Sequence, residues 1–261
     1  MLSSVVKRLN CYWRILATGF SFLAFGVGGL LLGLAVFPLL NLFVTERHSR
    51  VLAARHVVLV VFRAFVGLMR WLGVLRYEIS GLERLQRRGL LILANHPTLI
   101  DTVFLMAFVK HADCIVKSRL WTNPFTRGTV RAAGYISNDS GTGLLEDCIA
   151  SLRQGSNLII FPEGTRTDGP INLKRGAANI AVRSLSNVTP VIIRCVPPTL
   201  VKGAKWWQVP PVIARFRIEV KEEIDVLAFV EKAGSETLAA RHLTAYLQDY
   251  FRKESQSNAA A

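Results

Sequence analysis

Along residues 74–253, short apolar runs alternate with longer mixed stretches. The runs at 90–94 and 157–161 are bounded by polar residues, which is typical of strands buried on both faces of a sheet. The stretches at 98–109 and 143–152 are expected to form helices. The remaining expected elements are strands at 76–80, 113–117, 190–196 and 212–220 and helices at 174–185 and 236–252. This alternation predicts an α/β fold with a largely parallel central sheet flanked by helices.

A long uncharged segment precedes that domain. Residues 15–45 contain no Asp, Glu, Lys or Arg, and this is longer than the about 20 residues that cross a bilayer. A signal peptide fits poorly, because its apolar core would be about 7–15 residues long. Pro38 and several glycines interrupt the segment, which is compatible with one tilted helix or two kinked ones. Basic residues flank both ends, so the charge rule leaves a hairpin in one leaflet and a single crossing both open.

The next stretch, 51–75, is predicted to be a second helix. Arg55, Arg63 and Arg70 are spaced to share one side of it. Two interpretations are open: a helix lying in the lipid interface, or a helix packed on the domain with a solvated basic edge. The chain then divides into three expected regions, with membrane-anchoring helices at 1–73, the α/β domain at 74–253 and a disordered tail at 254–261.

Charge and composition narrow the class of partner. The chain has 261 residues, a net charge of +14 and a pI of about 10.2. Such a basic surface favours nucleic acid, anionic lipid or an acidic carrier protein. The mean hydropathy of +0.34 argues against a freely soluble nucleic-acid binder, so we expect membrane lipids as a partner and no nucleic acid. Four scattered cysteines without a CxxC pair indicate a reducing compartment and no structural metal.

The first candidate site lies where the strand at 90–94 ends. The sequence continues as Asn95-His96-Pro97-Thr98, and Asp101 follows His96 by five residues. Pro97 suits the first turn of a helix, so His96 is expected at a strand-to-helix corner with Asp101 in the first helical turns. Ligands bind at such corners in α/β sheets. A neutral imidazole there can take a proton, and a carboxylate can orient the ring and stabilise its charged form.

A second candidate site follows the strand at 157–161, where the sequence reads Phe-Pro-Glu-Gly-Thr-Arg and ends at Arg166. A polar loop with a glycine can bring backbone N–H groups and a guanidinium to an anion. Further along, Lys202 and Lys205 adjoin a tryptophan pair. That loop is expected either at a membrane interface or folded back on the core.

Together, the block Asn95–Asp101 and the block Phe161–Arg166 resemble those of glycerophospholipid acyltransferases of the lysophosphatidic acid acyltransferase family, over roughly residues 74–220. The resemblance implies acyl transfer from acyl-CoA or acyl carrier protein to a lysophospholipid hydroxyl, forming phosphatidic acid from 1-acylglycerol-3-phosphate without a cofactor or metal. It implies that His96 is the general base and Asp101 its orienting carboxylate. The residues that it implies for acceptor binding are Glu163, Gly164, Thr165 and Arg166, with further basic contacts at Lys117 and Lys174.

Two departures from the family pattern concern the acceptor. The middle block, 134–139, lacks the arginine that the family commonly has there and gains Asp139. The late block, 189–195, also differs from the usual proline-flanked apolar strand. A specialised acceptor, such as an amino-lipid or a polyketide-like lipid, is therefore an open alternative. The absence of a Gly-x-Ser-x-Gly elbow from the sequence speaks against an acyl-serine route.

Two further alternatives are of other classes. A non-catalytic lipid-binding protein on the same fold would be expected to lack His96 or Asp101, and both are present. Nucleic-acid binding would require a clustered basic face, whereas many basic residues lie beside apolar runs. We therefore expect an enzyme at the cytoplasmic (inner) membrane, with its catalytic domain facing the cytoplasm.

Overall fold

The computed structural model describes residues 2–139, 141–167 and 169–256. A seven-stranded sheet forms the centre, in the order β1-β7-β6-β2-β5-β3-β4. Every neighbouring pair is parallel except β6 and β7. The strands are β1 (Leu75–Ser80), β2 (Leu91–Ala94), β3 (Ala112–Val116), β4 (Ile136–Ser137), β5 (Asn157–Ile160), β6 (Val188–Val196) and β7 (Ala214–Val220). The predicted α/β fold with a largely parallel sheet is confirmed.

The two strands that the sequence predicts to be buried are the central ones. Every residue of β2 and β5 is buried, and the two strands pair in parallel. Gly89 adopts a φ of +71° just before β2, which is a conformation that favours glycine. The carboxyl ends of both strands therefore meet at one edge of the sheet, and the loops that follow them lie next to each other.

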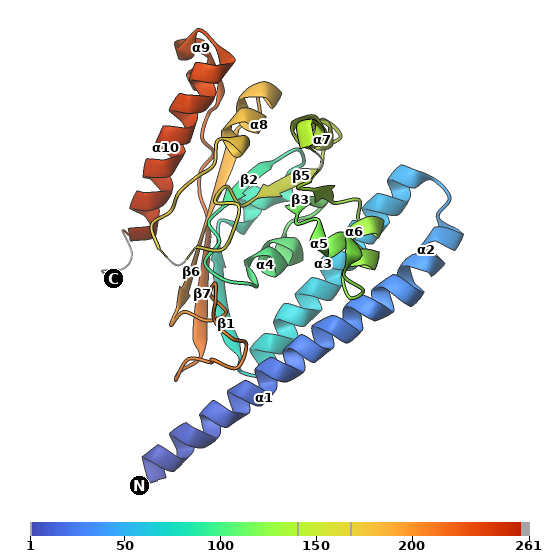
Figure 1. Cartoon of the computed structure of the whole chain (residues 1–261), viewed down its shortest axis with the longest axis vertical. Coiled ribbons are helices and arrows are strands. Elements are labelled where there is room, and N and C mark those ends of the chain that lie inside the picture. Colours follow the sequence, from blue (N-terminus) through green and yellow to red (C-terminus); the bar gives the residue numbers. More distant parts are fainter. Residues whose placement is uncertain (1, 140, 168, 257–261) are drawn as a thin grey trace.

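Helices cover both faces of the sheet (Figure 1). One face packs on α3 (Arg47–Trp71), α4 (Asp101–Phe108) and α6 (Arg127–Ala132), and the other on α7 (Leu144–Arg153), α8 (Gly176–Ser184) and α10 (Glu236–Gln256). The shorter elements are η2 (Leu82–Gln86), α5 (Arg119–Thr122), η3 (Gly141–Gly143) and α9 (Leu227–Ala233). These two layers leave the carboxyl edge of the sheet free for a site.

The amino-terminal segment is one long helix with a π-helical turn inside it. It runs through α1 (Leu2–Leu31), η1 (Leu32–Val36) and α2 (Phe37–Phe43), and α3 returns alongside it (Figure 1). Its glycines lie close to the domain: a Cβ added at Gly29 would be 2.1 Å from the Phe125 carbonyl oxygen, and one at Gly33 would be 3.3 Å from Cα of Gly128. The helix is therefore packed on the α/β domain.

Three arginines of α3 contact the domain. Arg55 forms a 2.7 Å ion pair with Asp113, and Nε of Arg63 donates to the Ala107 carbonyl oxygen at 3.1 Å. The guanidinium of Arg70 lies 5.5 Å from the centre of the Tyr77 ring. Of the two interpretations, the structure supports the packed helix. Arg55 is buried, whereas Arg63 and Arg70 contact the domain and remain exposed, as expected of a solvated basic edge.

Several expected boundaries move by a few residues, and two of these changes concern the site and the tail. Helix α4 begins at Asp101 and not at Thr98, because the backbone N–H and hydroxyl of Thr98 donate to the Asp101 carboxylate and turn the chain around it. Helix α10 continues to Gln256, which places Glu254 in a helix rather than in the expected tail. Residues 257–261 of that tail lie outside the described residues.

Candidate active site

The ring of His96 and the carboxylate of Asp101 are in direct contact. Nδ1 of His96 lies 2.9 Å from Oδ2 of Asp101, and the Asp101 side chain is fully buried. Thr98 completes the shell of the carboxylate, with its N–H 2.7 Å from Oδ2 and its hydroxyl 2.5 Å from Oδ1. Burial raises the pKa of Asp101, while the hydrogen bonds from His96 and Thr98 act in the opposite direction. With Nδ1–H donated to the carboxylate, Nε2 is the ring nitrogen that can accept a proton.

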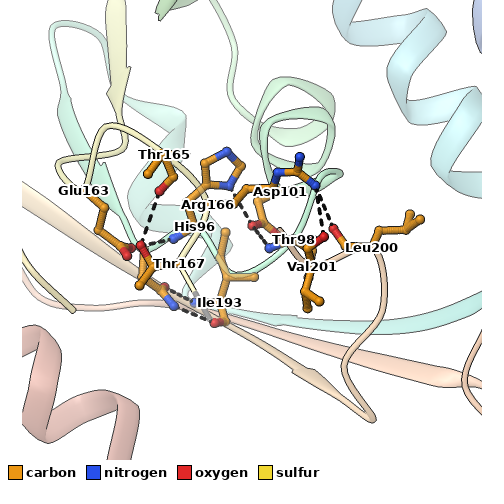
Figure 2. Close-up of polar contacts among 11 residues, drawn as sticks. His96, Thr98, Asp101, Glu163, Thr165, Arg166, Thr167, Ile193, Leu200 and Val201 are labelled. Carbon is orange, nitrogen blue, oxygen red and sulfur yellow. Dashed lines mark hydrogen bonds and ion pairs between the residues drawn. The ribbon is translucent and has the colours of Figure 1, made fainter. Parts of the chain in front are cut away.

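Contacts with β6 and with the loop after β5 fix the backbone around His96. The Asn95 side chain bonds both backbone groups of Ile193 on β6, at 2.8 and 2.7 Å. The His96 N–H donates to Oε1 of Glu163 at 2.9 Å, and the His96 carbonyl oxygen accepts from the Thr167 N–H at 3.0 Å (Figure 2). The loop after β2 is thereby tied to β6 and to the loop after β5.

The loop after β5 supports the ring as well as the backbone. The Phe161 ring stacks on the imidazole of His96, with centroids 4.2 Å apart. Glu163 is buried, and its Oε2 has no hydrogen-bond partner among the described residues. Gly164 has a φ of +72°, and a Cβ there would be 2.8 Å from Nζ of Lys174, so glycine suits both the backbone and the neighbouring ammonium group.

The guanidinium of Arg166 holds a neighbouring loop. Nη1 donates to the carbonyl oxygens of Leu200 and Val201, at 3.1 and 3.3 Å (Figure 2). The Leu200 carbonyl oxygen also accepts from the N–H of Leu99, which belongs to the loop between β2 and α4. Arg166 thus connects the site to the segment between β6 and β7.

A cavity of about 880 Å³ joins these elements. His96 and Phe161 line it, together with four cationic side chains: Lys117, Arg119, Arg166 and Lys174. The rest of the wall is mainly apolar and comes from α1, α3, α4 and α6, including Phe25, Phe62, Phe65, Met69, Val103 and Met106. A molecule with an anionic head and an apolar chain would match these surfaces.

The structure separates the predicted site residues into two groups. The residues that line the cavity are His96, Lys117, Gly164, Thr165, Arg166 and Lys174. Asp101 and Glu163 are instead buried behind the His96 loop, where both accept hydrogen bonds from it. Sequence reasoning missed the stacking of Phe161, the bridging role of Asn95 and the cation Arg119, although the first two lie inside the motifs that it selected.

Comparisons with known proteins cover the part of the chain that holds this site. The Acyltransferase family model matches residues 76–194, which include both motifs. The 1-acyl-sn-glycerol-3-phosphate acyltransferase of Helicobacter pylori is 33% identical over 112 residues, which are 40% of this chain and 47% of that protein. The enzyme of the same name from Pseudomonas aeruginosa is 29% identical over 142 residues; this match covers 49% of this chain and 53% of that enzyme. The chain thus spans about half the length of these relatives.

The fold also has a counterpart among solved structures. The 1-acyl-sn-glycerophosphate acyltransferase PlsC from Thermotoga maritima superposes with a TM-score of 0.73 and 22% sequence identity, covering 98% of each chain. At 22% identity this match supports the fold alone. The family model and the curated relatives are similar to this chain over the region that contains both motifs. Residues 76–194 therefore match the Acyltransferase family, and about half of the chain is similar to 1-acyl-sn-glycerol-3-phosphate acyltransferases.

Proposed function

We propose that this protein is a membrane-bound O-acyltransferase that moves a fatty acyl group from acyl-CoA or acyl carrier protein to the hydroxyl of a lysophospholipid. The observation that carries the proposal is the His96–Asp101 pair, with a 2.9 Å contact, at the wall of a cavity that has both cationic and apolar surfaces. The names of the curated relatives favour 1-acylglycerol-3-phosphate as the acceptor.

The pair supports a direct transfer without a covalent enzyme intermediate. Nε2 of His96 takes the proton of the acceptor hydroxyl while the hydroxyl oxygen attacks the carbonyl carbon of the thioester. The tetrahedral intermediate then collapses, the C–S bond breaks, and the imidazolium returns the proton to the thiolate. Asp101 keeps the ring in the required tautomer and stabilises its charged form. A thioester is already activated, so placing the hydroxyl and removing its proton are the main tasks.

The cations of the cavity suit an anionic acceptor head. Lys117 and Lys174 are exposed and line the cavity, whereas the Arg166 guanidinium already donates to two carbonyl groups. We assign the first contact with a phosphate to the lysines for that reason. Asn138, in the middle block that lacks an arginine, also lines the cavity. This neutral side chain favours the second candidate, a specialised acceptor such as an amino-lipid or a polyketide-like lipid.

Membrane attachment is proposed through the amino-terminal helices. Two helices, Arg8–Phe43 and Arg47–Trp71, are long and apolar enough to cross a bilayer. The first exposes a stripe of large apolar side chains at helical spacing: Leu9, Trp13, Leu16, Phe20, Leu23, Val27, Leu31 and Leu34. Its other side packs on the domain, and Arg55, Arg63 and Arg70 of α3 also contact the domain.

A crossing would pull that domain into the hydrocarbon layer, so we place both helices in one leaflet. The domain then faces the cytoplasm, where the soluble thioester donors are present. The hairpin in this assignment consists of the first helix and α3, and it differs from the hairpin within residues 15–45 that the sequence left open, because residues 15–43 form one continuous helix.

One assay tests the proposed activity. Purified protein in phosphatidylcholine vesicles is incubated with labelled acyl-CoA or acyl carrier protein and a panel of lysolipids, and products are identified by mass. We expect acylated 1-acylglycerol-3-phosphate, with acylation of an amino-lipid or polyketide-like acceptor supporting the second candidate. Acylation of no panel member by either donor would contradict the proposed activity.

A further inference from the structure

We infer that the loop between β6 and β7, residues 202–212, is a second membrane contact that binds an anionic lipid surface. The inference rests on the proposed membrane attachment and adds an element about 130 residues after the second of the two apolar helices. Three independent features of the loop support it: exposed aromatic side chains, positive charge without an ion-pair partner among the described residues, and direct contact with α1.

The loop presents two tryptophans at the protein surface. Trp206 and Trp207 are 43% and 46% exposed, and their rings lie 5.5 Å apart at nearly right angles. Val212, at the end of the loop, is 58% exposed. Tryptophan has an apolar ring and a polar N–H group, and it is enriched where a bilayer meets water. A loop folded back on the core would cover these rings.

The loop is also basic and has no acidic neighbours in sequence. Lys202 and Lys205 are exposed, and no Asp or Glu occurs between residues 169 and 218. Nζ of Lys205 lies 5.1 Å from the centre of the Trp207 ring, which places the charge beside the aromatic surface. Lysine next to tryptophan at a surface matches a layer of anionic headgroups above an apolar region.

The loop continues the surface of the amino-terminal helix (Figure 1). Trp206 packs on α1, where its ring is 6.3 Å from that of Phe22 and would be 3.1 Å from a Cβ at Gly19. The buried guanidinium of Arg14 donates to the Pro211 carbonyl oxygen at 2.7 Å. The loop is therefore fixed to the helix that carries the apolar stripe.

Two more tryptophans collect at the same end of the helices. Trp71, the last residue of α3, is 81% exposed, and Nε1 of Trp13 donates to the Leu72 carbonyl oxygen at 2.9 Å. Four of the five tryptophans of the chain thus lie on α1, at the end of α3 and in this loop. Such a group of aromatic residues is typical of proteins at a membrane interface.

The position of the loop has a consequence for the proposed reaction. Just before the loop, the carbonyl oxygens of Leu200 and Val201 accept from Arg166, and Leu200 also accepts from Leu99. Leu200 lines the cavity. A lipid contact at residues 202–212 therefore holds this side of the cavity at the headgroups, where a lysolipid acceptor lies.

Depth-sensitive fluorescence tests the contact. Cys11 and Cys195, the two half-buried cysteines, are replaced by serine, and Trp207→Cys is labelled with the fluorophore NBD. The full chain is placed in vesicles of phosphatidylcholine alone or of phosphatidylcholine and phosphatidylglycerol at 3:1, with or without spin-labelled lipid. Arg241→Cys, an exposed site on α10, is the matched control. Flotation of the vesicles and far-UV circular dichroism establish attachment and folding for each variant.

We expect blue-shifted emission and strong quenching by spin-labelled lipid at position 207, with neither at 241, and more quenching with phosphatidylglycerol. Replacing Lys202 and Lys205 by glutamine should lower the ratio of lipid-bound to free loop about fivefold per lysine. Equal quenching at 207 and 241 in floated protein would overturn the loop contact and leave the proposed membrane attachment intact. Failure of the folded protein to float would overturn both.

Discussion

Two buried carboxylates with basic partners lie at opposite edges of the same sheet. At the amino end of β3, Asp113 lies 2.7 Å from Nη2 of Arg55. At the carboxyl end of β2, Asp101 lies 2.9 Å from Nδ1 of His96. Burial raises the pKa of both carboxyl groups, and hydrogen bonds and the basic partner act in the opposite direction at each.

The partners and their surroundings differ. The guanidinium of Arg55 is buried, and its other N–H groups donate to the Ala133 carbonyl oxygen and the Ser156 hydroxyl. An arginine keeps its positive charge at any pH at which the protein is folded. His96 has a second nitrogen that can gain or lose a proton, and its ring lines the cavity. We therefore expect a buried carboxylate to act as a structural anchor or as part of the proposed catalytic pair, depending on whether its partner can exchange a proton and whether that partner faces a cavity.

The largest expected effect is on turnover. His96→Ala removes the proposed base, so acyl transfer should fall by about 10²–10⁴-fold, the usual contribution of general-base catalysis. Initial rates of the vesicle assay measure this, and flotation should show unchanged membrane association. If His96→Ala transfers acyl groups at the parent rate, the His96–Asp101 pair has no catalytic role and does not differ in function from the Arg55–Asp113 pair.

The second largest expected effect is on stability and concerns the buried Arg55–Asp113 pair. Arg55→Met leaves Asp113 as an unpaired buried charge, which should lower the free energy of unfolding by about 3–5 kcal/mol. Denaturant unfolding in detergent measures the change. The double variant Arg55→Met/Asp113→Asn should recover part of the loss, because the buried charge is gone. A single variant as stable as the parent would mean that this pair does not anchor α3.

Asp101→Asn should separate activity from stability. Turnover should fall, by less than in His96→Ala, because the amide no longer stabilises the imidazolium. The pKa of Asp101 is raised in the folded protein, so folding binds its proton and the contribution of this group to stability decreases as pH rises through that value. At neutral pH the variant should therefore melt at or above the parent temperature. A lower melting temperature at neutral pH would show that the charged carboxylate stabilises the fold.

The smallest expected effect distinguishes two roles for Glu163. Glutamine can still accept from the His96 N–H, so Glu163→Gln should keep kcat within about tenfold and leave the KM for the acceptor unchanged. Glu163→Ala should lower kcat further, again without a change in KM. An increase in KM with unchanged kcat in Glu163→Gln would instead favour the acceptor-binding role that the motif suggests.

Sequence periodicity predicted the sheet and the position of His96, because buried strands and the loops after them have local signals. The pairing of His96 with Asp101 followed from a five-residue spacing. The role of Arg55 could not be predicted, because its partner lies 58 positions away and helical spacing does not show which side of a helix meets the domain. The start of α4 was misplaced for a different, local reason: the Asp101 carboxylate accepts hydrogen bonds from Thr98, so the helix begins at Asp101.

The most direct test of the account is whether His96 and Asp101 act as one unit. Initial rates of acyl transfer are compared for the parent, His96→Ala, Asp101→Asn and the double variant. If Asp101 acts only through the imidazole, the double variant should be as slow as His96→Ala, within about twofold. A loss in the double variant equal to the product of the two single losses would contradict the catalytic pair.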